Sequence, residues 1–388
     1  MTLEHGGDLV SARNIYSGEI LDLSVNLNPM GPPPQVVQAA RDALEQVKAY
    51  PDPLCRDLRQ AIAQRDGVSP EQVFCGNGAA EVIFRLAMAL RPKAALLTAP
   101  TFSEYEGALT QVGCDCRFHV LRQEERFDVT ENILADIQRP VELVVLCSPN
   151  NPTGRLVSEE LLLRVLDRCR EIGAVLMVDE CFLPLVHGGR GMAPYLEDYP
   201  ELFLLRAFTK TYAIPGLRLG YGLGAPELIQ RLLTWGPCWN VSGPAQAAGL
   251  ACCALPDWPA EGRKLLEEQR PMLAQGLIRL GCRVIPGAAN YLLFRLPGTE
   301  DLKERLLRRG GWCAAAPTTA AWDRTGTGWP CGRRRTMNDS CAFWARNWRN
   351  DHGKVHHGAG HHVQCRKEFS GGRPVPYLQA GRPFSGPL

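Results

Sequence analysis

Residues 207–220 read Ala-Phe-Thr-Lys-Thr-Tyr-Ala-Ile-Pro-Gly-Leu-Arg-Leu-Gly, and the rest of the chain is interpreted around them. The apolar run Leu202 to Phe208 leads into them and predicts a buried strand. Lys210 follows this run, Thr209 precedes the lysine, and Arg218 lies further along in a Gly-rich turn. A lysine can bond covalently to an aldehyde cofactor, and a hydroxyl and an arginine can hold its phosphate. An isolated lysine is most often an ordinary surface residue, so the neighbouring motifs decide the interpretation.

The composition argues against several classes of protein. A chain of 388 residues has room for two or three domains, and its net charge of +2 favours neither nucleic acid nor membrane binding. The sequence contains no apolar run of about 18 residues and no secretory pattern in residues 1–8, so we expect a cytoplasmic protein. The 15 cysteines are scattered through apolar stretches without zinc-ligand spacing. We therefore expect reduced thiols and no metal site.

Apolar strands alternate with helical patterns along most of the chain. The expected strands are residues 21–27, 94–99, 141–146, 174–178 and 202–208, with further strands within 282–296. The expected helices are residues 33–47, 54–65, 82–90 and 158–172, followed by a mostly helical stretch from 223 to 280. Continuously apolar strands separated by helices predict an α/β fold with a mainly parallel sheet covered on both faces.

Polar or Gly-rich segments follow several of these strands. Residues 74–81, Phe-Cys-Gly-Asn-Gly-Ala-Ala-Glu, run directly into a helix whose N-terminus can hold an anion. Asp179 ends the strand 174–178, where a buried carboxylate needs a partner. On the residues alone, the first segment is also consistent with an ordinary turn, and Asp179 with a helix cap or a solvated strand end.

Together with residues 147–154, Cys-Ser-Pro-Asn-Asn-Pro-Thr-Gly, these motifs resemble fold-type I pyridoxal-phosphate enzymes of the class I/II aminotransferase family. The resemblance is to the branch that holds threonine-phosphate decarboxylases and histidinol-phosphate aminotransferases. It implies a large domain with a mostly parallel seven-stranded sheet, and a smaller α+β domain built from both chain ends. The expected divisions are 1–45 (N-terminal segment of the small domain), 46–265 (large cofactor-binding domain), 266–310 (truncated small domain) and 311–388 (aberrant tail).

The resemblance also implies roles for individual residues. Lys210 is the expected catalytic residue and binds pyridoxal 5'-phosphate covalently. The other expected cofactor contacts are Gly78, Ala79, Ala80, Phe102, Asn151, Asp179, Phe182, Thr209, Arg218 and Tyr50, the last of which reaches across a homodimer. The expected substrate contacts are His5, Asn28 and Asn151.

The N-terminal motifs indicate which reaction to expect. His5-Gly6-Gly7 and Asn26-Leu27-Asn28-Pro29 resemble the start of threonine-phosphate decarboxylases. The implied reaction is decarboxylation of L-threonine O-3-phosphate to (R)-1-aminopropan-2-yl phosphate in cobalamin biosynthesis. One alternative is a histidinol-phosphate aminotransferase, which shares every cofactor residue. Another is a frame-shifted, catalytically impaired product.

The sequence departs from the family pattern at three places. Ala207 replaces a Ser or Thr that contacts the phosphate, and Phe182 replaces a Tyr found in many relatives. Residues 311–388 carry 11 Lys and Arg against 4 Asp and Glu, no Ile and only two Leu. We therefore hypothesise a shift of reading frame near codon 310 and expect a disordered tail that lacks the family's substrate-carboxylate arginine. Sequencing the locus tests this, and an uninterrupted frame supported by the transcript would remove the hypothesis.

Overall fold

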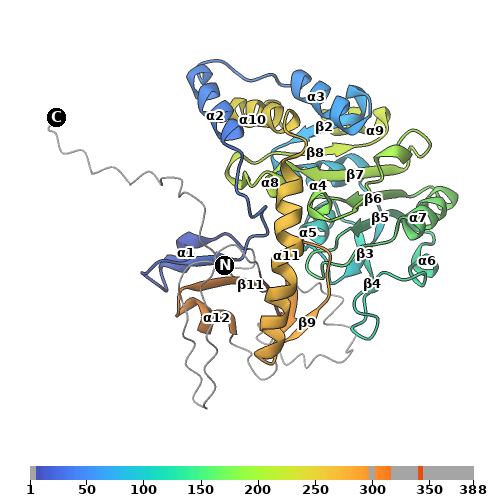
Figure 1. Ribbon diagram of the computed structural model, residues 1–388. Coiled ribbons are helices and arrows are strands. Elements are labelled where there is room, and N and C mark those ends of the chain that lie inside the picture. The colour runs from blue at the N-terminus through green and yellow to red at the C-terminus, as the bar shows by residue number, and fades with distance from the viewer. Residues whose placement is uncertain (1–5, 297–301, 316–339, 344–388) are drawn as a thin grey trace, which may run out of the picture. The chain divides into compact units, whose positions relative to one another are not determined.

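The computed structural model describes residues 6–296, 302–315 and 340–343, and Figure 1 shows them as ribbons. Its larger sheet has seven strands in the order β2-β8-β7-β6-β5-β3-β4. Their bounds are β2 Val73–Gly76, β3 Ala94–Ala99, β4 Asp115–Val120, β5 Val141–Cys147, β6 Val175–Asp179, β7 Leu202–Ala207 and β8 Gly220–Leu223. Only β8 runs antiparallel to its neighbours, and every other pair in this sheet is parallel. The mainly parallel sheet predicted from the sequence and the seven strands implied by the resemblance are thus confirmed.

Helices cover both faces of this sheet (Figure 1). One hydrophobic core lies under α2 Pro34–Ala43, α3 Arg56–Asp66, α7 Glu159–Ile172 and α10 Gly243–Cys253. The other lies under α4 Gly78–Leu90, α5 Glu104–Gln111 and α9 Pro226–Thr234. The strands between the two cores are buried on both sides, which explains their continuous apolar runs.

Shorter elements and one long helix complete the described fold. The remaining helices are α1 Leu9–Arg13, α6 Ile133–Asp136, α8 Phe208–Thr211, α11 Trp258–Arg279 and α12 Leu302–Leu307. The short 3-10 helices are η1 Leu44–Gln46, η2 Pro70–Gln72, η3 Leu183–Leu185, η4 Ala193–Tyr195 and η5 Pro215–Leu217. Among the residues that the structure describes, none of the helices combines the length and the apolar character needed to cross a membrane.

A second sheet has the strand order β1-β11-β12-β10-β9 and draws on both ends of the chain. Its strands are β1 Leu21–Leu23, β9 Arg283–Ile285, β10 Leu292–Arg295, β11 Gly311–Ala315 and β12 Ser340–Phe343. β1 pairs in parallel with β11, and the buried side chains of Leu23, Phe294 and Cys313 belong to one core. β11 thus continues the small sheet past residue 310 to Ala315, while the expected division into domains stays a prediction.

The strand expected over residues 21–27 is shorter in the structure. β1 ends at Leu23, and the Ser24 backbone N–H donates to Asp22 Oδ1 at 2.9 Å instead of continuing a ladder. Beyond this point the chain leaves the small sheet, and the Asn28 N–H donates to the Lys210 carbonyl at 2.9 Å. The N-terminal segment thereby reaches the end of β7, where the expected active site lies.

Candidate active site

Lys210 lies in α8, the short helix that follows β7. Its side chain is half-buried, and its Nζ atom lies 5.7 Å from the centroid of the Phe182 ring. Burial lowers the pKa of Lys210 below its ordinary value; Arg218 also lowers it, while Cys181 and Asp179 act in the opposite direction. A lowered pKa increases the fraction of neutral amine, which is the nucleophilic form of a lysine.

Asp179 ends β6, the strand beside β7, and is only 5% exposed. Its carboxylate accepts hydrogen bonds from Tyr105 Oη at 2.5 Å and from the Cys181 N–H at 2.8 Å. Burial raises the pKa of Asp179, although both hydrogen bonds act to lower it. This arrangement keeps a buried acid beside the lysine and gives its charged form two partners.

Tyr105 is the site residue that the sequence reasoning missed. It lies in the first turn of α5, is 1% exposed, and packs edge-on against Phe102 with ring centroids 5.6 Å apart. Burial raises its pKa well above the ordinary tyrosine value, so its hydroxyl stays a proton donor. The sequence around Tyr105 gives only a weak indication of this role, because a tyrosine in a helix next to a strand end is usually a core residue. Tyr105 comes close to Asp179 only once α5 packs on the sheet.

The N-terminus of α4 and Arg218 lie together and form a cradle around Gly78. Gly78 has a φ of 79°, and a Cβ atom at this position would overlap the Arg218 guanidinium. Gly220 of β8 packs as closely against the backbone of Gly78 and Ala79. Arg218 is exposed, with Nη1 donating to the Pro215 carbonyl at 3.3 Å. First-turn N–H groups at Ala79 and Ala80, beside an arginine, are suited to hold a phosphate.

Glu81 lies in the same first turn, but its charge is compensated. Its Oε2 accepts from the Asn77 N–H at 2.5 Å and from Asn240 Nδ2 at 2.8 Å. Its Oε1 pairs with Arg85 Nη2 at 2.8 Å, and Arg85 is buried. Glu81 therefore connects the first turn of α4 to Asn240, and its charge, which Arg85 balances, does not repel an anion at the N-terminus of the helix.

The loop after β5 is fixed by Asn150, the residue before the expected contact Asn151. Asn150 is 2% exposed; its Nδ2 donates to the Pro100 carbonyl at 3.0 Å, and its Oδ1 accepts from Thr101 Oγ1 at 3.0 Å. Its backbone carbonyl accepts from Tyr291 Oη at 2.8 Å. Asn151 itself is half-buried. The two asparagines therefore differ, because Asn150 holds the loop in place and Asn151 stays the expected ligand.

The other expected contacts have different surroundings. Thr209 is 6% exposed, and its hydroxyl donates to the Leu219 carbonyl at 3.2 Å. Tyr50 is 82% exposed, and its ring centroid lies 5.0 Å from that of Trp239. His5 lies outside the described residues. The contacts expected for Thr209, Tyr50 and His5 remain predictions.

The described groups match the chemistry of pyridoxal 5'-phosphate. A lysine of lowered pKa suits the aldehyde, the buried Asp179 suits a protonated ring nitrogen, and the cradle that a Cβ on Gly78 would fill suits the phosphate. Within the described residues, no group of three or more His, Cys, Asp or Glu side chains is placed to hold a metal ion.

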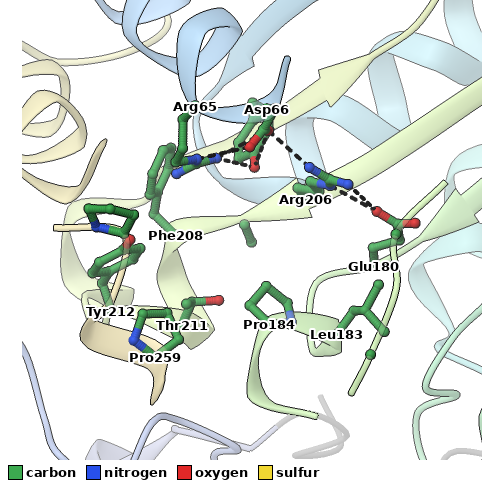
Figure 2. Close-up of a pocket in the computed structure, with 15 residues that line it drawn as sticks. Arg65, Asp66, Glu180, Leu183, Pro184, Arg206, Phe208, Thr211, Tyr212 and Pro259 are labelled. Atoms are coloured by element: carbon green, nitrogen blue, oxygen red, sulfur yellow. Dashed lines mark hydrogen bonds and ion pairs between the residues drawn. The ribbon is translucent and has the colours of Figure 1, made fainter. Parts of the chain in front are cut away.

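A cavity of about 270 Å³ lies next to α8, the short helix that carries Lys210. Its lining includes Phe208 and Thr211, which flank Lys210 in the chain, but not Lys210 itself. Figure 2 shows a charged network along one wall, in which Arg206 bridges Asp66 at 3.0 Å and Glu180 at 2.7 Å. This network connects the end of α3 to β7, the strand that leads to Lys210, and to Glu180, the residue after β6.

The charges of this network compensate one another. Burial alone would raise the pKa of Asp66, but Arg206 and Arg65 outweigh it, and the pKa of Asp66 falls below its ordinary value. Tyr221 Oη also donates to Asp66 Oδ2 at 3.0 Å. The network is therefore a structural support, since each carboxylate has an arginine partner.

The sequence matches known proteins over most of its length. The family model for aminotransferase class I and II matches residues 18–326. A threonine-phosphate decarboxylase from Salmonella typhimurium is 36% identical over 309 residues, which cover 78% of this chain and 85% of that protein. A histidinol-phosphate aminotransferase from Anaeromyxobacter sp. is 35% identical over 302 residues, covering 75% of this chain and 81% of that protein.

Solved structures agree with this assignment. The histidinol-phosphate aminotransferase from Clostridium acetobutylicum superimposes with a TM-score of 0.70 at 27% identity, covering 76% of this chain and 89% of that chain. The enzyme of the same name from Sinorhizobium meliloti, in complex with pyridoxal-5'-phosphate, gives a TM-score of 0.74 at 21% identity, covering 86% of this chain and 89% of that chain. At 21% identity this second likeness concerns the fold alone.

Proposed function

Because the chain belongs to the family of class I and II aminotransferases, whose cofactor is pyridoxal 5'-phosphate, we propose that it decarboxylates L-threonine O-3-phosphate. The product would be (R)-1-aminopropan-2-yl phosphate. The observation that carries the proposal is the N-terminal segment. Its motifs resemble those of threonine-phosphate decarboxylases, and its Asn28 N–H binds the Lys210 carbonyl at 2.9 Å, which brings the segment to the lysine.

The residues around Lys210 would hold the cofactor in the following way. The Lys210 amine would bind its aldehyde carbon, Asp179 its ring nitrogen, and Arg218 with the first turn of α4 its phosphate. When bound, the cofactor supplies an electron sink for the electron pair released at Cα of an amino acid. The Tyr105 hydroxyl stabilises the charged form of Asp179 and so strengthens its hold on a ring proton.

The outcome of the reaction depends on how the substrate is oriented. Decarboxylation requires the bond from Cα to the carboxylate to stand perpendicular to the cofactor ring, whereas transamination requires the bond from Cα to hydrogen there. The groups that hold the substrate phosphate and carboxylate therefore select the reaction. We propose that the N-terminal segment provides such groups, and that Lys210 Nζ returns a proton to Cα after carbon dioxide leaves.

A histidinol-phosphate aminotransferase is the second candidate. It is supported by the relative of 35% identity and by the shared cofactor residues, which do not distinguish the two reactions. A catalytically impaired product is the third candidate. It is supported by the change in composition after residue 310, including the absence of Ile from residues 311–388.

One experiment with two arms separates these candidates. The purified full chain, loaded with pyridoxal 5'-phosphate, is incubated with carboxyl-labelled L-threonine O-3-phosphate, and labelled carbon dioxide is measured. In parallel, histidinol phosphate and 2-oxoglutarate are supplied, and glutamate is measured. Carbon dioxide release supports the decarboxylase, and glutamate without carbon dioxide release overturns it in favour of the aminotransferase.

A third result is informative when cofactor binding is measured on the same sample. A protein that holds the cofactor but gives neither product is the impaired form. The Lys210→Met variant serves as the control in both arms, because it retains a long side chain but has no amine.

A further inference from the structure

The helix that carries Lys210 is too short to satisfy its own backbone carbonyls. α8 spans Phe208–Thr211, and a helix leaves its last four carbonyl groups without intrahelical partners. The Phe208 carbonyl accepts from the Tyr212 N–H at 2.9 Å, and the Thr209 carbonyl accepts from the Ile214 N–H at 3.2 Å. The carbonyls of Lys210 and Thr211 are then left to find donors elsewhere.

One residue from the N-terminal segment supplies both donors. The Asn28 backbone N–H donates to the Lys210 carbonyl at 2.9 Å, and Asn28 Nδ2 donates to the Thr211 carbonyl at 2.8 Å. Asn28 Oδ1 accepts from the Met30 N–H at 3.0 Å. Because that N–H can only donate, the atom facing it is the amide oxygen, which leaves the NH2 group for Thr211.

Asn28 is fully enclosed at this position. Its relative exposure is 0%, and a Cβ atom built on Gly262 of α11 would overlap its amide group. The side chain therefore has no room to turn toward a substrate while these bonds are made.

We propose that Asn28 is a positioning residue that fixes the backbone of Lys210 and Thr211, and thereby the place from which the Lys210 amine reaches the cofactor. The assignment differs from the substrate contact expected from the sequence. It rests on the proposed cofactor role of Lys210, but not on whether the reaction is decarboxylation or transamination. Through Asn28, the segment proposed to select the substrate also caps the helix that holds the lysine.

Two substitutions of Asn28 test the proposal, and one substitution of another buried asparagine provides a matched control. Asn28→Asp keeps the volume and the oxygen that faces Met30, but places a carboxylate oxygen against the Thr211 carbonyl. Asn28→Ala removes both side-chain bonds. The control is Asn290→Ala: Asn290 is 1% exposed, and its Nδ2 donates to the Leu27 carbonyl at 3.1 Å, so this bond holds the same segment at Leu27 and not at a carbonyl of α8.

The first readout needs no cofactor. Hydrogen–deuterium exchange is measured on the cofactor-free full chain for peptides that cover residues 208–214. In both Asn28 variants, we expect the Tyr212 and Ile214 amides, which donate to α8, to exchange about tenfold faster than in the unsubstituted chain, since a buried carbonyl has lost its donor. Urea denaturation confirms that each variant is folded under the conditions used.

The second readout reports on Lys210 directly. Pyridoxal 5'-phosphate is added at sub-saturating concentration, trapped by borohydride reduction, and quantified on the Lys210 peptide by mass spectrometry. We expect about tenfold slower trapping in both Asn28 variants and a change of less than threefold in Asn290→Ala.

Each outcome has a distinct meaning. Unchanged exchange and trapping in folded Asn28 variants would overturn the positioning role, as would an equal effect in Asn290→Ala. If the unsubstituted chain fails to trap the cofactor on Lys210, the proposed function fails, while the exchange measurement still decides the role of Asn28.

Discussion

Replacing Tyr105 by Phe tests whether the buried hydroxyl is needed to keep Asp179 charged. The substitution retains the ring, which is 1% exposed, and removes only the donor that lies 2.5 Å from the carboxylate. A hydrogen bond to a charged group contributes roughly 1.5–3 kcal/mol. If Asp179 binds the ring proton of the cofactor, that loss corresponds to about 10-fold to 150-fold weaker binding of pyridoxal 5'-phosphate.

The assay is a titration of cofactor-free protein with pyridoxal 5'-phosphate, followed by absorbance. Removal of the donor raises the pKa of Asp179 further, so the variant should lose affinity at a higher pH than the unsubstituted chain as the pH falls. Tyr199→Phe is the matched control, since its hydroxyl donates to Asp167 at 2.9 Å on the surface. Equal affinities for Tyr105→Phe and Tyr199→Phe at every pH would refute the reasoning.

Three further substitutions follow from the geometry. Gly78→Ala should weaken cofactor binding about tenfold or more, because the added Cβ overlaps Arg218. The control is Gly67→Ala, at a similar φ of 71° with nothing within 4 Å of the added Cβ, which should only lower the free energy of unfolding by about 1 kcal/mol. Equal cofactor affinities of the two variants would contradict this prediction. Lys210→Met should raise the melting temperature of the cofactor-free protein at pH 7, because the half-buried Lys210 has a depressed pKa and its charged form is costly in the folded state. The gain should fall to nothing as the pH rises toward 10.5, and no gain at pH 7 by scanning fluorimetry would count against this reasoning. Asp66→Asn should lower the free energy of unfolding, measured in urea at pH 7, by about 3 kcal/mol. The difference should be lost as the pH falls below 3.8, because the depressed pKa of Asp66 stabilises the fold only while the carboxylate is charged. An unchanged midpoint of urea denaturation at pH 7 would refute the prediction.

The parallel sheet was predictable because its strands are buried on both faces and therefore read as continuous apolar runs. The same logic located the strand ends, and the structure places Lys210 and Asp179 at the ends of the neighbouring strands β7 and β6. The family motifs then supplied the cofactor, which local patterns alone did not identify. These features were accessible because each depends on residues close together in the sequence.

Contacts between distant residues were not accessible in this way. Nothing near Tyr105 in the sequence indicates a bond to Asp179, because α5 must first pack on the sheet. The burial of Asn28 against α11 likewise appears only when both ends of the chain are assembled. The small-domain strand at 311–315 was missed because Trp-Cys-Ala-Ala lacks a clear strand pattern. This segment forms a strand because it pairs with β1, which is distant in the sequence.

The pairing of β1 with β11 has a consequence for how the chain is synthesised. Leu21 precedes every strand of the seven-stranded sheet in the sequence, but its partner Gly311 is synthesised only after all of them. β1 therefore cannot pair until β11 has been synthesised, and the long loop that this pairing closes slows folding. The hypothesised change of reading frame near codon 310 falls at this neighbour, so it would affect the pairing of β1 as well as β11 itself.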